Sequence, residues 1–320
     1  MKGRGLGLGV FMSLVAGAAS LLAVATNIRD AASAELGDVA RPIKLAINEW
    51  TGQHLTTHIA GRILEKMGYK VEYVTAGYIA QHIAIADGSL DASLEVWSSQ
   101  VSDVYHHGIQ SGKIVDLGSV GLETREGWLY PKYVEAMCPG LPDWTALKSC
   151  AAKFATPETF PNGRIVAYPA EWGTRTADRI AGLALPYKAV PAGSEGALIA
   201  ELKGAAAAQK PLIMEFWSPH WVLAEVEVEW VNLPPRTPEC EETHACEFPQ
   251  PIVTKEVRAG FDATWPAAFE LLKQYKLDAG EQMRMVLEID QKGRSLETVV
   301  SDWLEKHEAT WKGWIEAARR

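Results

Sequence analysis

Hydrophobic and polar positions follow two different periods along residues 43–96. Short runs rich in apolar and β-branched residues at 43–47, 70–74 and 92–96 have the length and composition of strands. Between them, residues 55–67 and 79–86 repeat apolar side chains at helical spacing and end at glycine-containing turns. This strand–helix alternation predicts an α/β fold with a parallel sheet covered by helices.

A second set of alternating elements follows further along the chain. Strands are predicted at 164–168, 211–216 and 252–255, and helices at 176–183, 194–208, 265–275, 280–288 and 296–318. Extended connecting chain is predicted at 115–120 and 128–130, and a long Pro-, Glu- and Cys-rich connection at 232–251. We therefore predict two lobes with a ligand cleft between them. Lobe 1 comprises residues 35–127 and 250–320, and lobe 2 comprises residues 128–249 with the connecting segment.

Residues 1–34 have the pattern of a secretory signal peptide. A basic start at Lys2 and Arg4 precedes a Gly- and Ala-rich apolar run, and Ala32-Ser33-Ala34 offers a small-x-small cleavage site. An earlier site at Ala23-Val24-Ala25 is an alternative, and so is a membrane anchor, because the run approaches the ~20 residues needed to span a bilayer. The signal peptide is favoured, which predicts a periplasmic protein cleaved near Ala34.

The composition narrows the class of partner. The formal net charge of −9 becomes −11 without residues 1–34, which hold three basic groups and one acidic group. Such an acidic chain lacks the basic surface that nucleic acids require, so we expect no nucleic-acid partner. The glycines form no phosphate-binding loop and no dinucleotide motif, and no cofactor is expected.

Four cysteines lie in the exported part of the chain. In an oxidising compartment an even count favours disulfides, and we predict the local pairs Cys138–Cys150 and Cys240–Cys246. A metal site built from Cys240, His244 and Cys246 is the alternative, but no recognised zinc spacing fits. Calcium at the acidic 239–247 segment lacks a loop motif, and no metal is expected. His82, His106 and His107 are interpreted as surface groups.

The candidate ligand-binding residues are tryptophans. Six of the twelve tryptophans lie in short loop-like contexts, several directly after a predicted strand: Trp50, Trp97, Trp128, Trp172, Trp217 and Trp221. Open α/β sheets place ligand-contacting loops at such positions. Indole faces attract a cation, so converging tryptophans form a cage for a methylated onium group. Trp221 is assigned to structural support, and the remaining six to packing.

Four segments, in this order, resemble one known family. Residues 64–69 resemble the end of its first helix, and Val96-Trp97-Ser98 resembles its Asn-Trp-x-Pro segment with the proline replaced. Trp172-Gly173-Thr174 resembles a Pro-Gly-Trp-Gly segment, and residues 216–221 resemble a Trp-x-Pro-x-Trp segment. Over the whole exported chain, the sequence resembles the periplasmic substrate-binding proteins of glycine betaine/choline ABC importers.

The resemblance implies a type II periplasmic binding-protein fold, a monomer, and the membrane subunits of an ABC importer as partners. It implies that Trp97, Trp172 and Trp217 enclose the onium group. The backbone N–H groups of Gly173 and Thr174 would hold a ligand carboxylate at a helix N-terminus. Trp50 and Trp128 match aromatic positions of the family's choline-binding branch. Glu171 and Glu49 adjoin cage tryptophans and either add negative potential or face water, and Arg175 either assists or is solvated.

Two departures from the family's pattern leave the polar group of the ligand unidentified. Gly52 stands where choline binders carry an acidic residue, and Gln100 and Val101 occupy the stretch where betaine binders carry a histidine. The expected ligand is a small methylated onium osmolyte, with glycine betaine first, then trimethylamine N-oxide and dimethylsulfoniopropionate. Choline or carnitine is the alternative. An exported enzyme acting on a methylated amine through Glu171 and His220, or a sensory module, are the other function classes considered.

Overall fold

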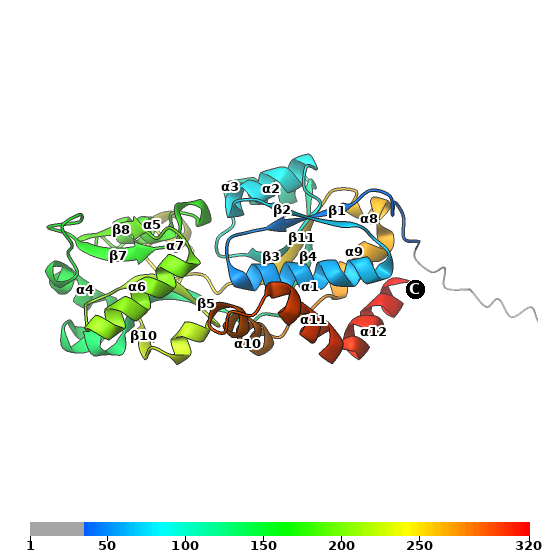
Figure 1. Ribbon diagram of the computed structural model, residues 1–320. Coiled ribbons are helices and arrows are strands. Elements are labelled where there is room, and N and C mark those ends of the chain that lie inside the picture. Colours follow the sequence, from blue (N-terminus) through cyan, green and yellow to red (C-terminus); the bar gives the residue numbers. More distant parts are fainter. Residues whose placement is uncertain (1–34) are drawn as a thin grey trace, which may run out of the picture. The chain divides into compact units, whose positions relative to one another are not determined.

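The computed structural model describes residues 35–320, which form two five-stranded sheets flanked by helices (Figure 1). The α/β class predicted from the sequence is confirmed. The predicted signal peptide lies at residues 1–34, outside the described residues. No helix within 35–320 is long and apolar enough to cross a membrane.

The first sheet has the strand order β2-β1-β3-β11-β4. Its strands are β1 (Ile43–Ile47), β2 (Val71–Thr75), β3 (Ala92–Trp97), β4 (Ile114–Ser119) and β11 (Val253–Arg258). The first three are parallel, as predicted, whereas β11 is antiparallel to both of its neighbours. The helices near these strands in the chain are α1 (Thr51–Met67), α2 (Tyr78–Asp87) and α3 (Asp103–Gln110).

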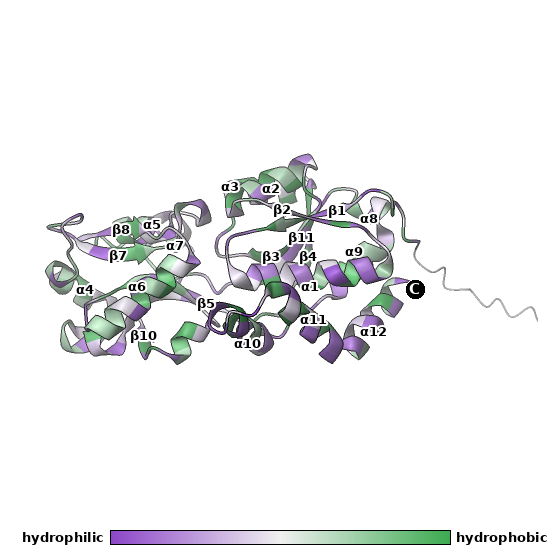
Figure 2. Ribbon diagram, viewed as in Figure 1, coloured by the Kyte–Doolittle hydropathy of each residue, from purple (hydrophilic) through white to green (hydrophobic). Residues whose placement is uncertain are grey.

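The C-terminal helices complete this half of the molecule. They are α8 (Phe261–Thr264), α9 (Pro266–Gln274), α10 (Ala279–Asp290), α11 (Leu296–Lys306) and α12 (Glu308–Ala318). The predicted single helix over 296–318 is divided in two at His307. Mixed hydrophobic and hydrophilic colouring around α11 and α12 in Figure 2 is typical of helices with one buried face, and Val299, Val300 and Trp303 lie on that face of α11.

The second sheet has the order β10-β5-β9-β7-β8. Its strands are β5 (Arg125–Pro131), β7 (Gly163–Ala167), β8 (Tyr187–Pro191), β9 (Met214–Ser218) and β10 (Val228–Trp230), and β6 (Pro139–Pro142) lies apart. Its α-helices are α4 (Leu147–Cys150), α5 (Arg175–Gly182), α6 (Glu195–Ala208) and α7 (Cys240–Thr243). Single 3-10 turns are η1 (Lys132–Ala136), η2 (Trp144–Ala146), η3 (Ala151–Lys153), η4 (Ala170–Trp172) and η5 (Trp221–Ala224).

The chain passes between the two sheets twice, from β4 to β5 and from β10 to β11. Two segments predicted as connecting chain, 115–120 and 128–130, are strands β4 and β5 of the structure. Strand β5 begins at Arg125, so it spans the predicted lobe boundary at 127/128. One cluster of buried residues includes side chains of both sheets, such as Leu45 and Met214, and a second cluster in the second sheet contains Trp128, Tyr130 and Ile165 among others.

The structure joins Cys138 to Cys150 and Cys240 to Cys246, with Cα–Cα separations of 5.6 and 5.9 Å. Within residues 35–320, no group of three or more His, Cys, Asp or Glu side chains could hold a metal ion. His82 differs from its predicted surface position. It is fully buried, with its Nδ1 2.8 Å from Oε1 of Glu256 on β11, because α2 packs this face against the sheet.

Candidate functional site

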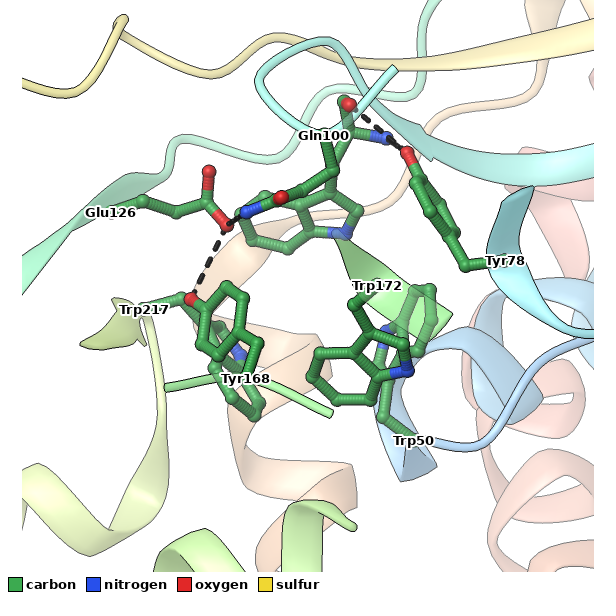
Figure 3. A pocket seen from close by; sticks show the side chains of 8 residues that line it. Trp50, Tyr78, Gln100, Glu126, Tyr168, Trp172 and Trp217 are labelled. Carbon is green, nitrogen blue, oxygen red and sulfur yellow. Dashed lines mark hydrogen bonds between the residues drawn. The ribbon is translucent and has the colours of Figure 1, made fainter. Parts of the chain in front are cut away.

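A small cavity lies among side chains contributed by both sheets (Figure 3). Its volume is about 30 Å³. Eight residues line it: Trp50, Tyr78, Trp97, Gln100, Glu126, Tyr168, Trp172 and Trp217. Six of the eight are aromatic, so the wall consists mainly of ring faces and edges.

Three of the rings come from the carboxyl ends of strands in the first sheet. Trp97 is the last residue of β3, Trp50 is the N-cap of α1 just after β1, and Tyr78 begins α2 after β2. Parallel strands end at one edge of their sheet, which brings together side chains far apart in sequence. The Tyr78 hydroxyl lies 2.9 Å from both the carbonyl oxygen and the amide nitrogen of Trp97, which fixes these two rings relative to each other.

The other wall comes from the second sheet. Tyr168 follows β7, Trp172 lies in η4, and Trp217 lies on β9. Glu126 on β5 is directly opposite Trp217 in the antiparallel β5–β9 register. Because directly opposite residues share a face of the sheet, Glu126 and Trp217 reach the cavity together.

The rings meet mostly edge to face. Trp50 and Trp172 lie 5.2 Å apart between ring centroids at 68°, and Trp172 and Trp217 lie 6.0 Å apart at 67°. The Tyr168 ring is 5.4 Å from Trp172 and 5.7 Å from Trp217. Such tilted packing turns several aromatic faces toward one enclosed space, the arrangement that attracts a diffuse positive charge.

Carboxylates outside the cavity accept the indole N–H groups. The Nε1 atoms of Trp50 and Trp97 donate to Oε1 of Glu95 at 2.8 and 3.1 Å. Nε1 of Trp172 donates to Oε2 of Glu49 at 3.1 Å, which ties the second-sheet ring to a residue after β1. These N–H groups have their acceptors outside the cavity. The three tryptophans therefore present only ring carbon atoms to a ligand.

Glu126 is the charged side chain of the wall, and it is almost fully buried. Gln100 Nε2 donates to its Oε1 at 2.9 Å and the Tyr168 hydroxyl donates at 3.2 Å, while the Ser99 hydroxyl donates to Oε2. The Arg175 guanidinium lies 3.6 Å from Oε2. Both oxygens of the buried Glu126 side chain therefore have polar partners within the protein.

Burial raises the pKa of Tyr168 well above its ordinary value, and the neighbouring charge of Glu126 raises it further. Burial likewise raises the pKa of Tyr78. Both phenols therefore stay protonated at neutral pH and serve as O–H donors. The polar part of the wall combines one anion with neutral groups that donate.

The structure brings four of the five predicted cage tryptophans to the cavity and places the fifth elsewhere. Trp50, Trp97, Trp172 and Trp217 line it. Trp128 instead lies in the core of the second sheet, where Nε1 donates to the Thr176 hydroxyl at 2.9 Å and the ring contacts Phe248. Along β5 it is two residues deeper than Glu126, about 7 Å further from the strand's end.

The predicted polar residues do not line the cavity. Glu171 and Thr174 are exposed, and the Gly173 N–H donates to the Ala170 carbonyl at 3.3 Å. Gly173 nonetheless lies beside the wall: it has φ +129°, and a Cβ there would be 3.6 Å from Oε1 of Gln100. Trp221, assigned to structural support, donates from Nε1 to Asp290 at 2.9 Å and does not line the cavity.

Sequence analysis missed four lining residues or their roles: Tyr78, Gln100, Glu126 and Tyr168. The signal for Glu126 is its position two residues before Trp128 in a strand whose other side chains after Arg125 are all buried. A charged residue in such a run needs partners, which makes it a candidate for a site. Gln100 was identified only as the replacement for an expected histidine.

Comparisons with known proteins agree with this geometry. A family model described as the substrate binding domain of ABC-type glycine betaine transport system matches residues 41–306. A trimethylamine N-oxide-binding protein of Pelagibacter ubique (strain HTCC1062) is 31% identical over 285 residues, which cover 86% of this chain and 90% of the relative.

Solved structures share the fold at low sequence identity. A choline-binding protein of an ABC transporter in complex with choline has a TM-score of 0.73 at 16% identity, covering 86% of this chain and 91% of its own. Lactococcal OpuAC in its closed form with glycine betaine has a TM-score of 0.68 at 18% identity, covering 86% and 99%. The predicted two-lobed type II binding-protein fold is thereby confirmed.

Proposed function

Since the chain belongs to the family of substrate-binding domains of ABC-type glycine betaine transport systems, we propose that it captures trimethylamine N-oxide and delivers it to an ABC importer. The family consists of transport binding proteins and not of enzymes. His220 and Glu171, the two residues considered for an enzyme, do not pair with each other. Nε2 of His220 lies 3.4 Å from Glu195, whereas Glu171 is exposed.

The buried carboxylate of Glu126 is the observation that supports the N-oxide over glycine betaine, which the sequence placed first. A betaine ends in a carboxylate, which would repel Glu126 in a site with little water to screen the charges. The N-oxide carries no carboxylate, and its single oxygen has a proton affinity in the same range as a carboxylate. It can therefore share a proton with Glu126 or accept from the Gln100 amide or the Tyr168 hydroxyl.

The size of the cavity supports the same ligand. Its volume of about 30 Å³ is small, and tryptophan and tyrosine rings enclose it on both sides. Trimethylamine N-oxide is the smallest of the osmolytes considered, so it requires the least separation of these rings. The P. ubique relative, at 31% identity, is a trimethylamine N-oxide-binding protein.

Aromatic faces supply the affinity in this proposal. Each desolvated face contributes ~0.5–2 kcal/mol to cation binding, so Trp50, Trp97, Trp172 and Trp217 together supply much of the ~8 kcal/mol that a micromolar Kd requires. A primary ammonium would lose its hydrogen bonds to water among ring carbons, so amino acids are rejected.

Choline is the second candidate, and the same carboxylate favours it. Its hydroxyl could donate to Glu126, although Gly52 replaces the acid found in choline binders. The larger choline requires a wider cavity than the present one.

Both sheets contribute to the cavity wall, which supports a mechanism of closure around the ligand. We propose that the two parts of the chain that carry the first sheet and the part that carries the second sheet, which begins at β5, act as two lobes of a monomer, and that the ligand selects the closed form. Residues 1–34 act as the export signal, with cleavage near Ala34, and place the protein outside the cytoplasm.

Isothermal titration of the purified protein tests the proposal. The panel comprises trimethylamine N-oxide, glycine betaine, dimethylsulfoniopropionate, choline, carnitine and proline. We expect the N-oxide to bind most tightly, with a Kd in the micromolar range. Strongest binding of glycine betaine would overturn the role given to Glu126, and strongest binding of proline would overturn the cage itself.

A further inference from the structure

We propose that Glu95, which lies behind the cavity wall and is not among its lining residues, determines the affinity of the cage by holding two of its indoles and by its own negative charge. The inference rests on the proposed binding of a methylated onium compound. It assigns Glu95 a positioning and electrostatic role, distinct from the contact role given to Glu126.

Four donors surround the Glu95 carboxylate. Its Oε1 accepts from Trp50 Nε1 at 2.8 Å and from Trp97 Nε1 at 3.1 Å. Its Oε2 lies 2.7 Å from the Thr56 hydroxyl and accepts from Gln282 Nε2 at 2.9 Å. Indole and amide N–H groups can only donate, so at least three of these contacts require an acceptor at Glu95.

The fold brings these groups together from three elements. Glu95 and Trp97 are two residues apart on β3 and therefore lie on the same face of the sheet. Trp50 and Thr56 belong to the beginning of α1, and Gln282 lies on α10. Every residue of β3 is buried, and Glu95 is the charged residue in that strand. The carboxylate thus fixes the two rings in one orientation before a ligand arrives, which lowers the entropic cost of binding.

Burial raises the pKa of Glu95 above its ordinary value, and the hydrogen bonds from Thr56, Trp50, Trp97 and Gln282 oppose this rise without cancelling it. These donors favour the ionised form. An N–H group that donates to a carboxylate shifts electron density into its ring, which makes the ring face more negative. The charge also attracts a cation through a medium of low dielectric constant. Both effects strengthen binding of a positively charged methylated nitrogen, which choline carries as a net charge and trimethylamine N-oxide as the positive end of its N–O dipole, and they add little for an alcohol of equal shape.

That difference between charged and uncharged ligands separates the proposal from a purely structural role. Glu95→Gln keeps the size of the side chain and an acceptor oxygen but removes the charge. The probes are two pairs of equal shape: trimethylamine N-oxide with tert-butanol, and choline with 3,3-dimethylbutan-1-ol. Affinities are measured by titration calorimetry or, for the weak alcohols, by tryptophan fluorescence.

We expect E95Q to bind the onium compounds about tenfold more weakly and the alcohols within about twofold of the wild type. Equal losses for both members of a pair would show a merely structural role and overturn the proposal, and so would unchanged affinities. If the wild type binds no onium compound, the proposed function fails first. If the wild type binds the onium compounds but the ratio of the onium Kd to the alcohol Kd (the charged-to-neutral ratio) is unchanged in E95Q, only the inference about Glu95 is rejected.

Glu49→Gln is the matched comparison. Glu49 also accepts an indole N–H, that of Trp172, but it is exposed and accepts only one. Water screens its charge, so we expect a smaller change in the charged-to-neutral ratio than in E95Q. An equal or larger change in E49Q would contradict the role of burial in the proposal.

A measurement on the wild type covers the case in which E95Q does not fold. In ¹⁵N-edited NMR spectra, the indole N–H signals of Trp50 and Trp97, assigned through W50F and W97F, should lie at low field and exchange slowly, because a buried carboxylate accepts both. Signals at the positions of solvent-exposed indoles would overturn the proposal without any Glu95 variant.

Discussion

Replacing Glu126 by glutamine should shift the preference of the site from the N-oxide toward glycine betaine. The substitution keeps the size of the side chain and removes the one charge in the cavity wall. Gln100 and the Tyr168 hydroxyl still find an acceptor oxygen in the new amide, so the wall keeps much of its geometry. The Arg175 guanidinium, 3.6 Å from the carboxylate in the wild type, becomes available to a ligand carboxylate.

The expected size of the effect follows from Coulomb's law. Two carboxylates about 4 Å apart repel by ~4 kcal/mol at an effective dielectric constant of ~20. Arg175 offsets part of this repulsion, which leaves about 1–2 kcal/mol of selection against betaine. We therefore expect the ratio of the betaine Kd to the N-oxide Kd to fall by about tenfold in E126Q.

Titration calorimetry with both ligands at low and at physiological ionic strength measures this ratio. Glu123→Gln is the matched control, because it removes the same charge from an exposed position just before β5. E123Q should leave the ratio within about twofold of the wild type. An E126Q ratio equal to that of E123Q would refute the reasoning that the buried carboxylate selects against acidic ligands.

Three further predictions concern other parts of the molecule. Trp172→Ala should weaken N-oxide binding by at least about tenfold in titration calorimetry with folding preserved, since it removes one cage face. Trp128→Phe should leave the Kd within about twofold but lower the free energy of unfolding by about 1 kcal/mol in urea titrations, because it loses the hydrogen bond to Thr176. Burial lowers the pKa of Lys255 from 10.5 to about 7, so the unfolded chain binds a proton that the folded chain does not between these values, and stability falls as the pH decreases from about 10.5 to about 7. Lys255→Met should remove this slope in urea midpoints measured at pH 7 and 9.5, and an unchanged slope would contradict the assignment.

The sequence predicts the first βαβαβ unit well, because its periods are strong and its turns contain glycine. The run at 43–47 coincides with β1, and the helix predicted at 55–67 ends where α1 ends. Its beginning was placed too late, since the polar residues that follow Trp50 belong to the first turn of α1. The beginning matters for the site, because it makes Trp50 the N-cap of a helix that packs against β3.

The cavity was less predictable than the fold. A tryptophan motif identifies a ring, but the depth of that ring along a strand depends on register, and Trp128 is two residue pairs further into the sheet than Glu126. Tyr168 and Gln100 reach the cavity through loops whose course no local pattern determines. The sequence identified the four tryptophans that line the cavity, but it did not single out Glu126, because the strand in which that residue is buried was predicted as connecting chain.

The closeness of the cavity tryptophans has an optical consequence. Trp172 lies 5.2 Å from Trp50 and 6.0 Å from Trp217, distances at which indole transitions couple and split in the near-ultraviolet circular dichroism spectrum. Any change in the spacing of these rings alters that splitting. The protein therefore contains its own unlabelled chromophore for following, in real time, whether the two sheets are drawn together or apart.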